Sequence, residues 1–143
     1  MLKRTILMVF CTMMLALGSM AQSKVDYVIA DNYFPLRSVI APVDTVILSN
    51  QKFFSMFGIA AHMGSDAIPY PINFDKEFVI VVQLPPASRY VEIEPLLLWE
   101  SEKYLELSYH VNYGQSLSWT MNPTLILIVD QKYWRPRIMC TER

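Results

Sequence analysis

Two short runs that are apolar at every position constrain the fold of this chain most strongly. They are residues 78–82, which read FVIVV, and residues 125–129, which read LILIV. A strand with apolar side chains on both faces must be covered on both faces, and the β-branched content argues against buried helices of the same length. The two runs therefore predict central strands of a sheet with packing on both sides.

Strict alternation of apolar and polar residues marks two further strands. Residues 104–112 read YLELSYHVN, and residues 90–98 begin with the same period, with Val91 and Ile93 on the apolar side. Such a period of two is typical of a strand with one face on the core and the other in water. The polar residues 100–103 between them predict a hairpin. Two more segments predict shorter strands, residues 25–29 and 45–48.

One segment has the period of a helix instead. Residues 49–58 begin with Ser49, a favoured N-cap, and end with Gly58, which tolerates a positive φ. The apolar residues Phe53, Met56 and Phe57 follow the spacing of one helical face. An isolated helix of about ten residues is unstable in water, so it must pack against the sheet. The predicted fold class is α+β and mostly β, with one antiparallel or mixed sheet and a single short helix packed across it.

The first 21 residues predict a signal peptide. Lys3 and Arg4 precede an apolar stretch that is too short to span a bilayer, and the small residues of Ser19–Ala21 suit cleavage before Gln22. A lipoprotein signal at Cys11 is the alternative, but large residues precede that cysteine. We therefore expect export to the periplasm or the extracellular space, and no stable membrane insertion after cleavage. Residues 22–143 are predicted to form a single β-rich domain.

Charge and cysteine usage exclude several classes. The chain has 12 Lys and Arg, of which two leave with the signal peptide, so 10 remain against 13 Asp and Glu, a net charge of −3. Nucleic-acid binding needs concentrated positive charge, so no nucleic-acid partner is expected. Cys140 is alone in residues 22–143, and no disulfide can form within the chain. A packed thiol is favoured over a thiol nucleophile there, and a homodimer through an intermolecular disulfide stays open.

The order of the predicted elements resembles a known family. A Phe-rich helix is followed by residues 73–82 (NFDKEFVIVV), then by residues 86–93 (PASRYVEI) and finally by residues 120–123 (TMNP) before the last apolar run. This resembles the C-terminal domain of bacterial protease complex-assembly proteins over about residues 45–130. The chain has Ser88 and Arg89 where that family tends to have a glycine pair. The resemblance implies a small exported accessory module and brings no catalytic residues with it.

The candidate metal and catalytic residues each have a simpler interpretation. His62 and Asp66, together with His110, could form a zinc site, but His110 falls on the polar side of a predicted strand. Glu92 and Glu94 share one strand face as glycosidase carboxylates could, and adjacent residues of any strand face meet that spacing. We therefore expect no catalytic residue, no metal and no cofactor.

Two segments predict a protein-binding surface. The first is the proline-stiffened loop 59–73, in which Met63, Ile68 and Tyr70 are apolar residues at positions expected to be exposed. The alternative is that this loop folds back and covers the sheet. In the second segment, residues 132–137 (KYWRPR), Trp134 and Arg135 are of the types enriched at interface hot spots. An edge strand protected by charge would give the same pattern.

The sequence as a whole favours an exported, non-enzymatic protein-binding or accessory module. Its partner would be another protein, such as a secreted protease or another envelope complex. The first alternative is a protease-inhibitor-like protein that presents Pro85–Arg89 as a rigid exposed loop. A small hydrolase that uses His62 or His110 is the weaker alternative.

Overall fold

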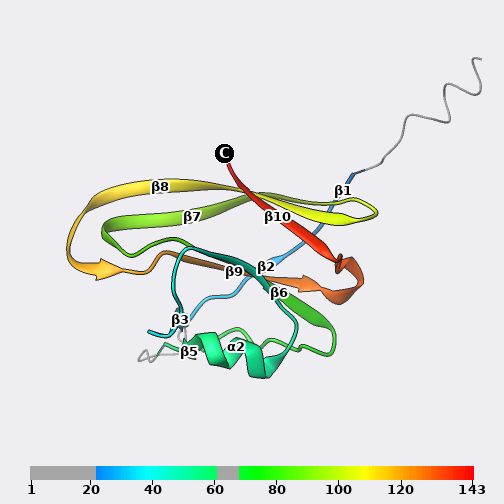
Figure 1. Ribbon diagram of the computed structural model, residues 1–143, viewed down its shortest axis with the longest axis horizontal. Coiled ribbons are helices and arrows are strands. Elements are labelled where there is room, and N and C mark those ends of the chain that lie inside the picture. Colours follow the sequence, from blue (N-terminus) through cyan, green and yellow to red (C-terminus); the bar gives the residue numbers. More distant parts are fainter. Residues whose placement is uncertain (1–21, 61–67) are drawn as a thin grey trace, which may run out of the picture.

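Residues 22–60 and 68–143 are described by a computed structural model, which forms three layers (Figure 1). The predicted signal peptide, residues 1–21, lies outside the described residues. The upper layer, sheet A, has the strand order β1 (Ser23–Lys24), β7 (Ala87–Glu100), β8 (Tyr104–Met121) and β10 (Arg137–Glu142). The middle layer, sheet B, has the order β2 (Val28–Ile29), β9 (Thr124–Asp130), β6 (Glu77–Gln83) and β4 (Val43–Ile47). The lower layer holds helix α2 (Asn50–Met56) and the paired strands β3 (Tyr33–Pro35) and β5 (Phe57–Ile59).

The two apolar runs are confirmed as central strands. They form β6 and β9, which pair antiparallel with Ile80 opposite Leu127, and each has a neighbour on its other edge. Alternate residues of β6 serve different cores. Phe78 and Ile80 pack in the cluster between sheets A and B, whereas Val79 packs with Phe53 of α2 on the opposite face. Both faces are therefore covered, as the sequence requires.

In the residues that the structure describes, the fold is mostly β with one short α-helix, as predicted, but the expectation of one sheet is wrong. These residues form two four-stranded sheets and a two-stranded one. The β7–β8 hairpin packs its apolar face on sheet B and does not join sheet B as additional strands. Of the predicted strand 25–29, only the last two residues form a strand, β2, which pairs with β9 of sheet B. β1 precedes this segment and pairs with Trp99 and Glu100 of sheet A, and Val25 is fully buried in the core between the sheets.

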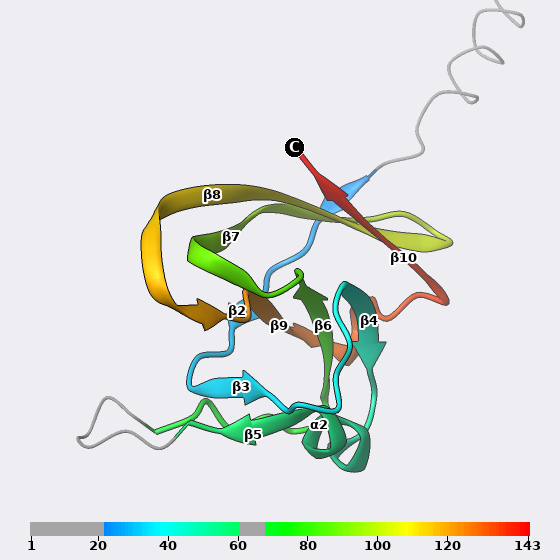
Figure 2. The ribbon, with the colours of Figure 1, turned by 60° about the vertical axis from the view of Figure 1, so that its left-hand side comes forward.

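The predicted hairpin is present and is longer than expected. β7 and β8 are joined at residues 101–103, and β8 continues well past residue 112 to Met121. Figure 2 shows the C-terminal part of β8, at the end of the hairpin away from the turn, curling over one side of the molecule. Most side chains of residues 113–121 are exposed or half-buried, so this part of β8 has no apolar alternation by which sequence could reveal it.

Helix α2 forms with the predicted N-cap but ends early. The Ser49 hydroxyl accepts a hydrogen bond from the Lys52 amide (3.2 Å), and Phe53 is fully buried against sheet B. Gly58 is not the helix C-cap, because it lies in β5 opposite Phe34. A Cβ atom at Gly58 would lie 2.6 Å from Cζ of Phe34, so the glycine serves the close approach of that ring.

An edge strand, the alternative interpretation of residues 132–137, is present but begins only at Arg137. Residues 131–133 form a short 3₁₀ helix, η2 (Gln131–Tyr133), and β10 then pairs in parallel with β8 from Arg137 onward. Pro136 has no amide hydrogen to give to a ladder, so pairing starts after it. Cys140 therefore lies in a paired edge strand and packs against the core.

Candidate functional site: a groove at the open edge of the sandwich

A hollow lies where sheets A and B leave an edge open to each other. It has a volume of about 860 Å³. Its walls are residues 90–95 of β7, the segment between Ile29 and Pro35 that leaves β2, and residues 119–125 where β8 turns into β9. We call this hollow the β7 groove.

The groove follows the free edge of β7. Residues 90–95 all border it, although the side chains of Val91 and Ile93 are buried and those of Glu92 and Glu94 are exposed. The side chains of consecutive strand residues point to opposite faces of the sheet. A hollow that borders all six residues must therefore lie along the edge of the strand. On this side β7 pairs only at Trp99 and Glu100, with β1. Within the described residues, the edge from residue 88 to residue 97 has no partner strand.

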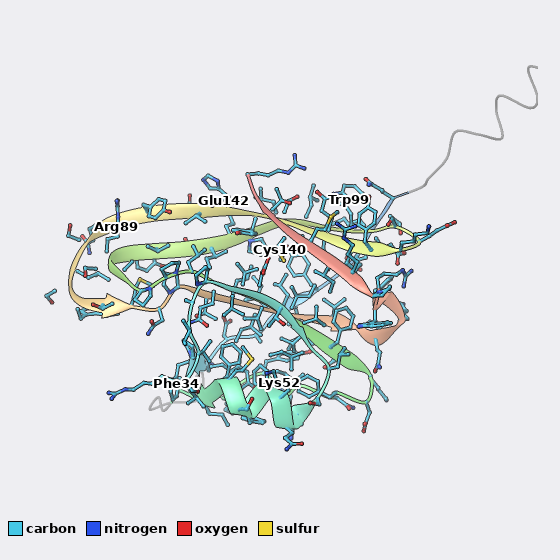
Figure 3. The ribbon with its side chains drawn as sticks, in the orientation of Figure 1. Phe34, Lys52, Arg89, Trp99, Cys140 and Glu142 are labelled. Atoms are coloured by element: carbon cyan, nitrogen blue, oxygen red, sulfur yellow. The ribbon has the colours of Figure 1, made fainter. Side chains whose placement is uncertain are left out.

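Large apolar side chains around the groove are unusually exposed. The exposed fractions are 43% for Ile29, 44% for Phe34, 47% for Tyr90 and 59% for Trp119, and all four residues border the hollow. Figure 3 shows Phe34 in the lower layer and Arg89 on the hairpin above it, at the same end of the molecule. An exposed apolar cluster in a concave site is a common feature of binding surfaces.

A glycine permits the position of one of these aromatic residues. A Cβ atom at Gly114 of β8 would lie 3.0 Å from Cβ of Tyr90, which is closer than most side chains tolerate. Tyr90 therefore lies over the backbone of the neighbouring strand and stays half-exposed. The same relation holds for Phe34 over Gly58 in the lower layer.

The electrostatic character of the groove is acidic. Asp31, Glu92 and Glu94 border it, and no Lys or Arg does so among the described residues. The exposed Glu94 carboxylate accepts a hydrogen bond from the side-chain amide of Asn112 (3.2 Å). Arg89 of β7 interacts with the neighbouring strand β8. Its guanidinium donates to the Gly114 carbonyl (3.0 Å) and lies 5.0 Å from the centre of the Tyr113 ring.

A smaller hollow of about 220 Å³ adjoins the groove, with Pro35 and Asn122 bordering both. Gln83 at the end of β6 contributes to its wall and is 2% exposed. Its side-chain oxygen has no hydrogen-bond partner among the described residues. A buried acceptor of this kind favours a donor from a bound molecule or solvent.

The predicted loop residues lie near β3. Ile68 is 74% exposed, and its carbonyl accepts a hydrogen bond from the Asn32 side chain (3.3 Å). The Tyr70 ring is 41% exposed, while its carbonyl accepts a bond from the Tyr33 hydroxyl (2.6 Å). Burial raises the pKa of Tyr33 above its ordinary value, so this donor keeps its proton. Met63 lies outside the described residues.

Trp134 and Arg135 belong to the other edge of the sandwich. Trp134 borders a hollow of about 330 Å³ between β4 and β10, together with Asp44 and Cys140. The Arg135 guanidinium is bound within the chain, to a carboxylate oxygen of Glu100 (2.9 Å) and to the Ser101 carbonyl (3.0 Å). That hollow does not include Tyr70, whose carbonyl bonds to Tyr33 of β3 instead. Among the described residues, Trp134 and Tyr70 therefore do not share the hollow between β4 and β10.

The residues of the alternative functions are also placed. His110 is exposed, as predicted, and its Nδ1 pairs with the Arg143 carbonyl. Within the described residues no three His, Cys, Asp or Glu side chains gather as metal ligands, and His62 and Asp66 lie outside those residues. The expectation of an exposed loop at Pro85–Arg89 is wrong in its second half, because Ala87–Arg89 already belong to β7.

Comparison with known proteins identified no relative of this chain. No family model, curated protein or solved structure matches the chain. The resemblance to protease complex-assembly proteins therefore stays a prediction. In the described part of the chain, no helix has the length and apolar character needed to cross a membrane.

Sequence reasoning missed the groove residues, although part of the signal was present. Trp119 lies in a stretch without apolar alternation, where a large aromatic residue has no evident core to join. The free edge of β7 depends on which strands pair, and that cannot be read from local sequence.

Proposed function

We propose that this chain is an exported, non-enzymatic protein-binding module that acts as an accessory to another protein of the cell envelope or the extracellular space. The observation that carries the proposal is the β7 groove, in which Phe34, Tyr90 and Trp119 are each more than 40% exposed around a hollow of about 860 Å³. Leaving three aromatic rings half in water forgoes the stabilisation that their burial would give. A partner that covers them would recover it.

The residue types support a protein partner. Tyr and Trp are enriched at the energetic centres of protein interfaces, and the groove combines them with the exposed carboxylates of Glu92 and Glu94. A secreted protease or another envelope complex would be a partner of the kind that the family resemblance implies. The groove, rather than the loop 59–73, becomes the first surface to test.

The test is capture of partners from the envelope and secreted fractions of the native host. The immobilised chain is compared with Trp119→Ala, and captured proteins are identified by mass spectrometry. We expect Trp119→Ala to weaken capture of the specific partner by about 30-fold, the effect of losing about 2 kcal/mol at a hot spot.

Phe54→Ala is the control, because Phe54 is also an exposed aromatic residue (44%, against 59% for Trp119) and lies on α2, outside the groove. It should leave capture unchanged. Equal capture by wild type and Trp119→Ala would contradict a binding role for the groove. Capture lost in Trp134→Ala alone would move the binding surface to the opposite edge of the sandwich.

A further inference from the structure

We infer that the β7 groove binds an extended, basic segment of its partner, which adds to sheet A as a strand along the free edge of β7. The inference rests on the proposed function and specifies how the partner is recognised. An exposed strand edge presents unpaired amide and carbonyl groups, and an extended peptide can complete the ladder.

The backbone of β7 is available for such pairing. Its edge from residue 88 to residue 97 lacks a partner strand within the described residues, and residues 90–95 border the hollow. The Val91 amide donates to the sulfur of Met121 (3.2 Å), which is a weak acceptor. A carbonyl oxygen from an added strand would be a stronger partner for an amide at this edge.

Two features limit the length of the added strand. Pro95 has no amide hydrogen, so a ladder on this edge loses a donor there. Beyond it, β1 already occupies the edge at Trp99 and Glu100, and the Val25 amide bonds to the Leu98 carbonyl (2.8 Å). Residues 90–94 remain, and at about 3.4 Å per residue they accommodate roughly five residues of partner.

Charge complementarity identifies the partner segment as basic. Asp31 lies on one wall of the groove and Glu92 and Glu94 on the other, without a cation among the described lining residues. Lys or Arg at alternate positions of the added strand would face the carboxylates of Glu92 and Glu94, which are two residues apart on one face. The remaining positions would meet the apolar side, toward Phe34 and Trp119.

The same charges argue against a second copy of this chain as the occupant. Antiparallel pairing of two β7 edges centred on residues 92–94 would bring Glu92 and Glu94 of one copy opposite those of the other. Like charges directly opposite each other destabilise a strand pair. The basic peptide segment is therefore the favoured occupant.

The experiment measures binding of fluorescent pentapeptides to the full chain by anisotropy. The probe is Lys-Val-Lys-Val-Lys, and the comparison peptide is Glu-Val-Glu-Val-Glu. We expect the basic peptide to bind at least tenfold more tightly, with an affinity that falls as salt rises. Methylation of one alternate set of peptide amides should abolish binding, whereas methylation of the other set should not, because only one set faces β7.

Matched charge reversals locate the site. Glu92→Lys should weaken binding of the basic peptide at least tenfold, while Glu102→Lys, in the turn between β7 and β8, changes the net charge equally and should have little effect. Hydrogen exchange within residues 90–94 should slow when the peptide binds.

Three results would overturn the inference: equal affinity for the two peptides, no effect of either methylation pattern, or equal effects of the two charge reversals. If no peptide binds but Trp119→Ala still abolishes capture of a host partner, strand addition is wrong and the proposed function stands. If the basic peptide binds as described and no host partner depends on Trp119, strand addition is supported and the accessory role is contradicted.

Discussion

The Cys140 thiol is held in its protonated form by its surroundings. Burial, and to a lesser degree the nearby carboxylate of Asp44, raise the pKa of Cys140 from 9.0 to about 11. The thiolate is the reactive species in alkylation and disulfide exchange. Cys140 is therefore a poor nucleophile at neutral pH, and a disulfide between two copies should form slowly.

We predict that native Cys140 reacts with iodoacetamide at pH 8 much more slowly than the same thiol in the urea-unfolded chain. The native rate should rise only as the pH approaches about 11. Because the folded state binds this proton more tightly than the unfolded state, the contribution of Cys140 to stability is complete below about pH 9 and is lost between about pH 9 and 11. Equal labelling rates for native and unfolded chain at pH 8 would contradict the burial of this thiol.

Tyr70 and Trp134 test whether the predicted partner residues serve binding or folding. Each is 41% exposed. Truncation of the Tyr70 side chain keeps the Tyr70 backbone carbonyl, which accepts the hydrogen bond from the Tyr33 hydroxyl. We predict that Tyr70→Ala and Trp134→Ala each lower the melting temperature by less than about 4 °C, the shift that about 1 kcal/mol produces in a domain of this size. If the partner binds at these residues instead of the β7 groove, each change should weaken partner capture by about 2 kcal/mol. A larger thermal loss in both variants, without an effect on capture, would show that they cover the fold.

At the scale of the elements, β6 and β9 depend on cover from two sides. Ile80 lies between the sheets, and Ile126 lies on the face that α2 covers. We predict that Ile80→Ala and Ile126→Ala each cost about 2–5 kcal/mol of unfolding free energy, measured by urea denaturation. Glu106→Ala is the control, because it loses only the ion pair of the half-buried Glu106 with the exposed Arg143 (3.5 Å), worth about 0–1 kcal/mol. Equal shifts of the three urea midpoints would contradict the layered arrangement.

The elements that sequence could predict are those whose patterns arise from local chemistry. The runs at 78–82 and 125–129, the hairpin and the helix beginning after Ser49 all have a period or a cap that reports burial directly. The missed features depend on distant pairing. The crossing of residues 25–27 between sheets, the position of β10 after Pro136 and the open edge of β7 are set by which strands become neighbours. The β7 groove depends on which strand edges stay unpaired, so no local sequence motif predicts it.

At the scale of the whole molecule, export stays a prediction with a direct test. We predict that the intact mass of exported protein corresponds to residues 22–143, with or without cyclisation of the N-terminal glutamine. A mass that retains Met1, or one that includes a lipid on Cys11, would contradict cleavage before Gln22.

The pairing of β6 with β9 also bears on how the chain reaches its native state. β7 and β8 are neighbours in sequence and can meet early, whereas β6 must wait for β9, which follows the entire hairpin. Bringing distant strands together costs chain entropy before their contacts form, and this slows folding. We therefore expect folding in the millisecond-to-second range typical of sandwich topologies. During that interval residues 78–82 and 125–129 each have an open strand edge, and both segments are uncharged and β-prone, which is the composition of aggregation-prone segments. A holdase that shields these two segments until the hairpin has closed would raise the yield of folded protein more than one that acts on the finished surface.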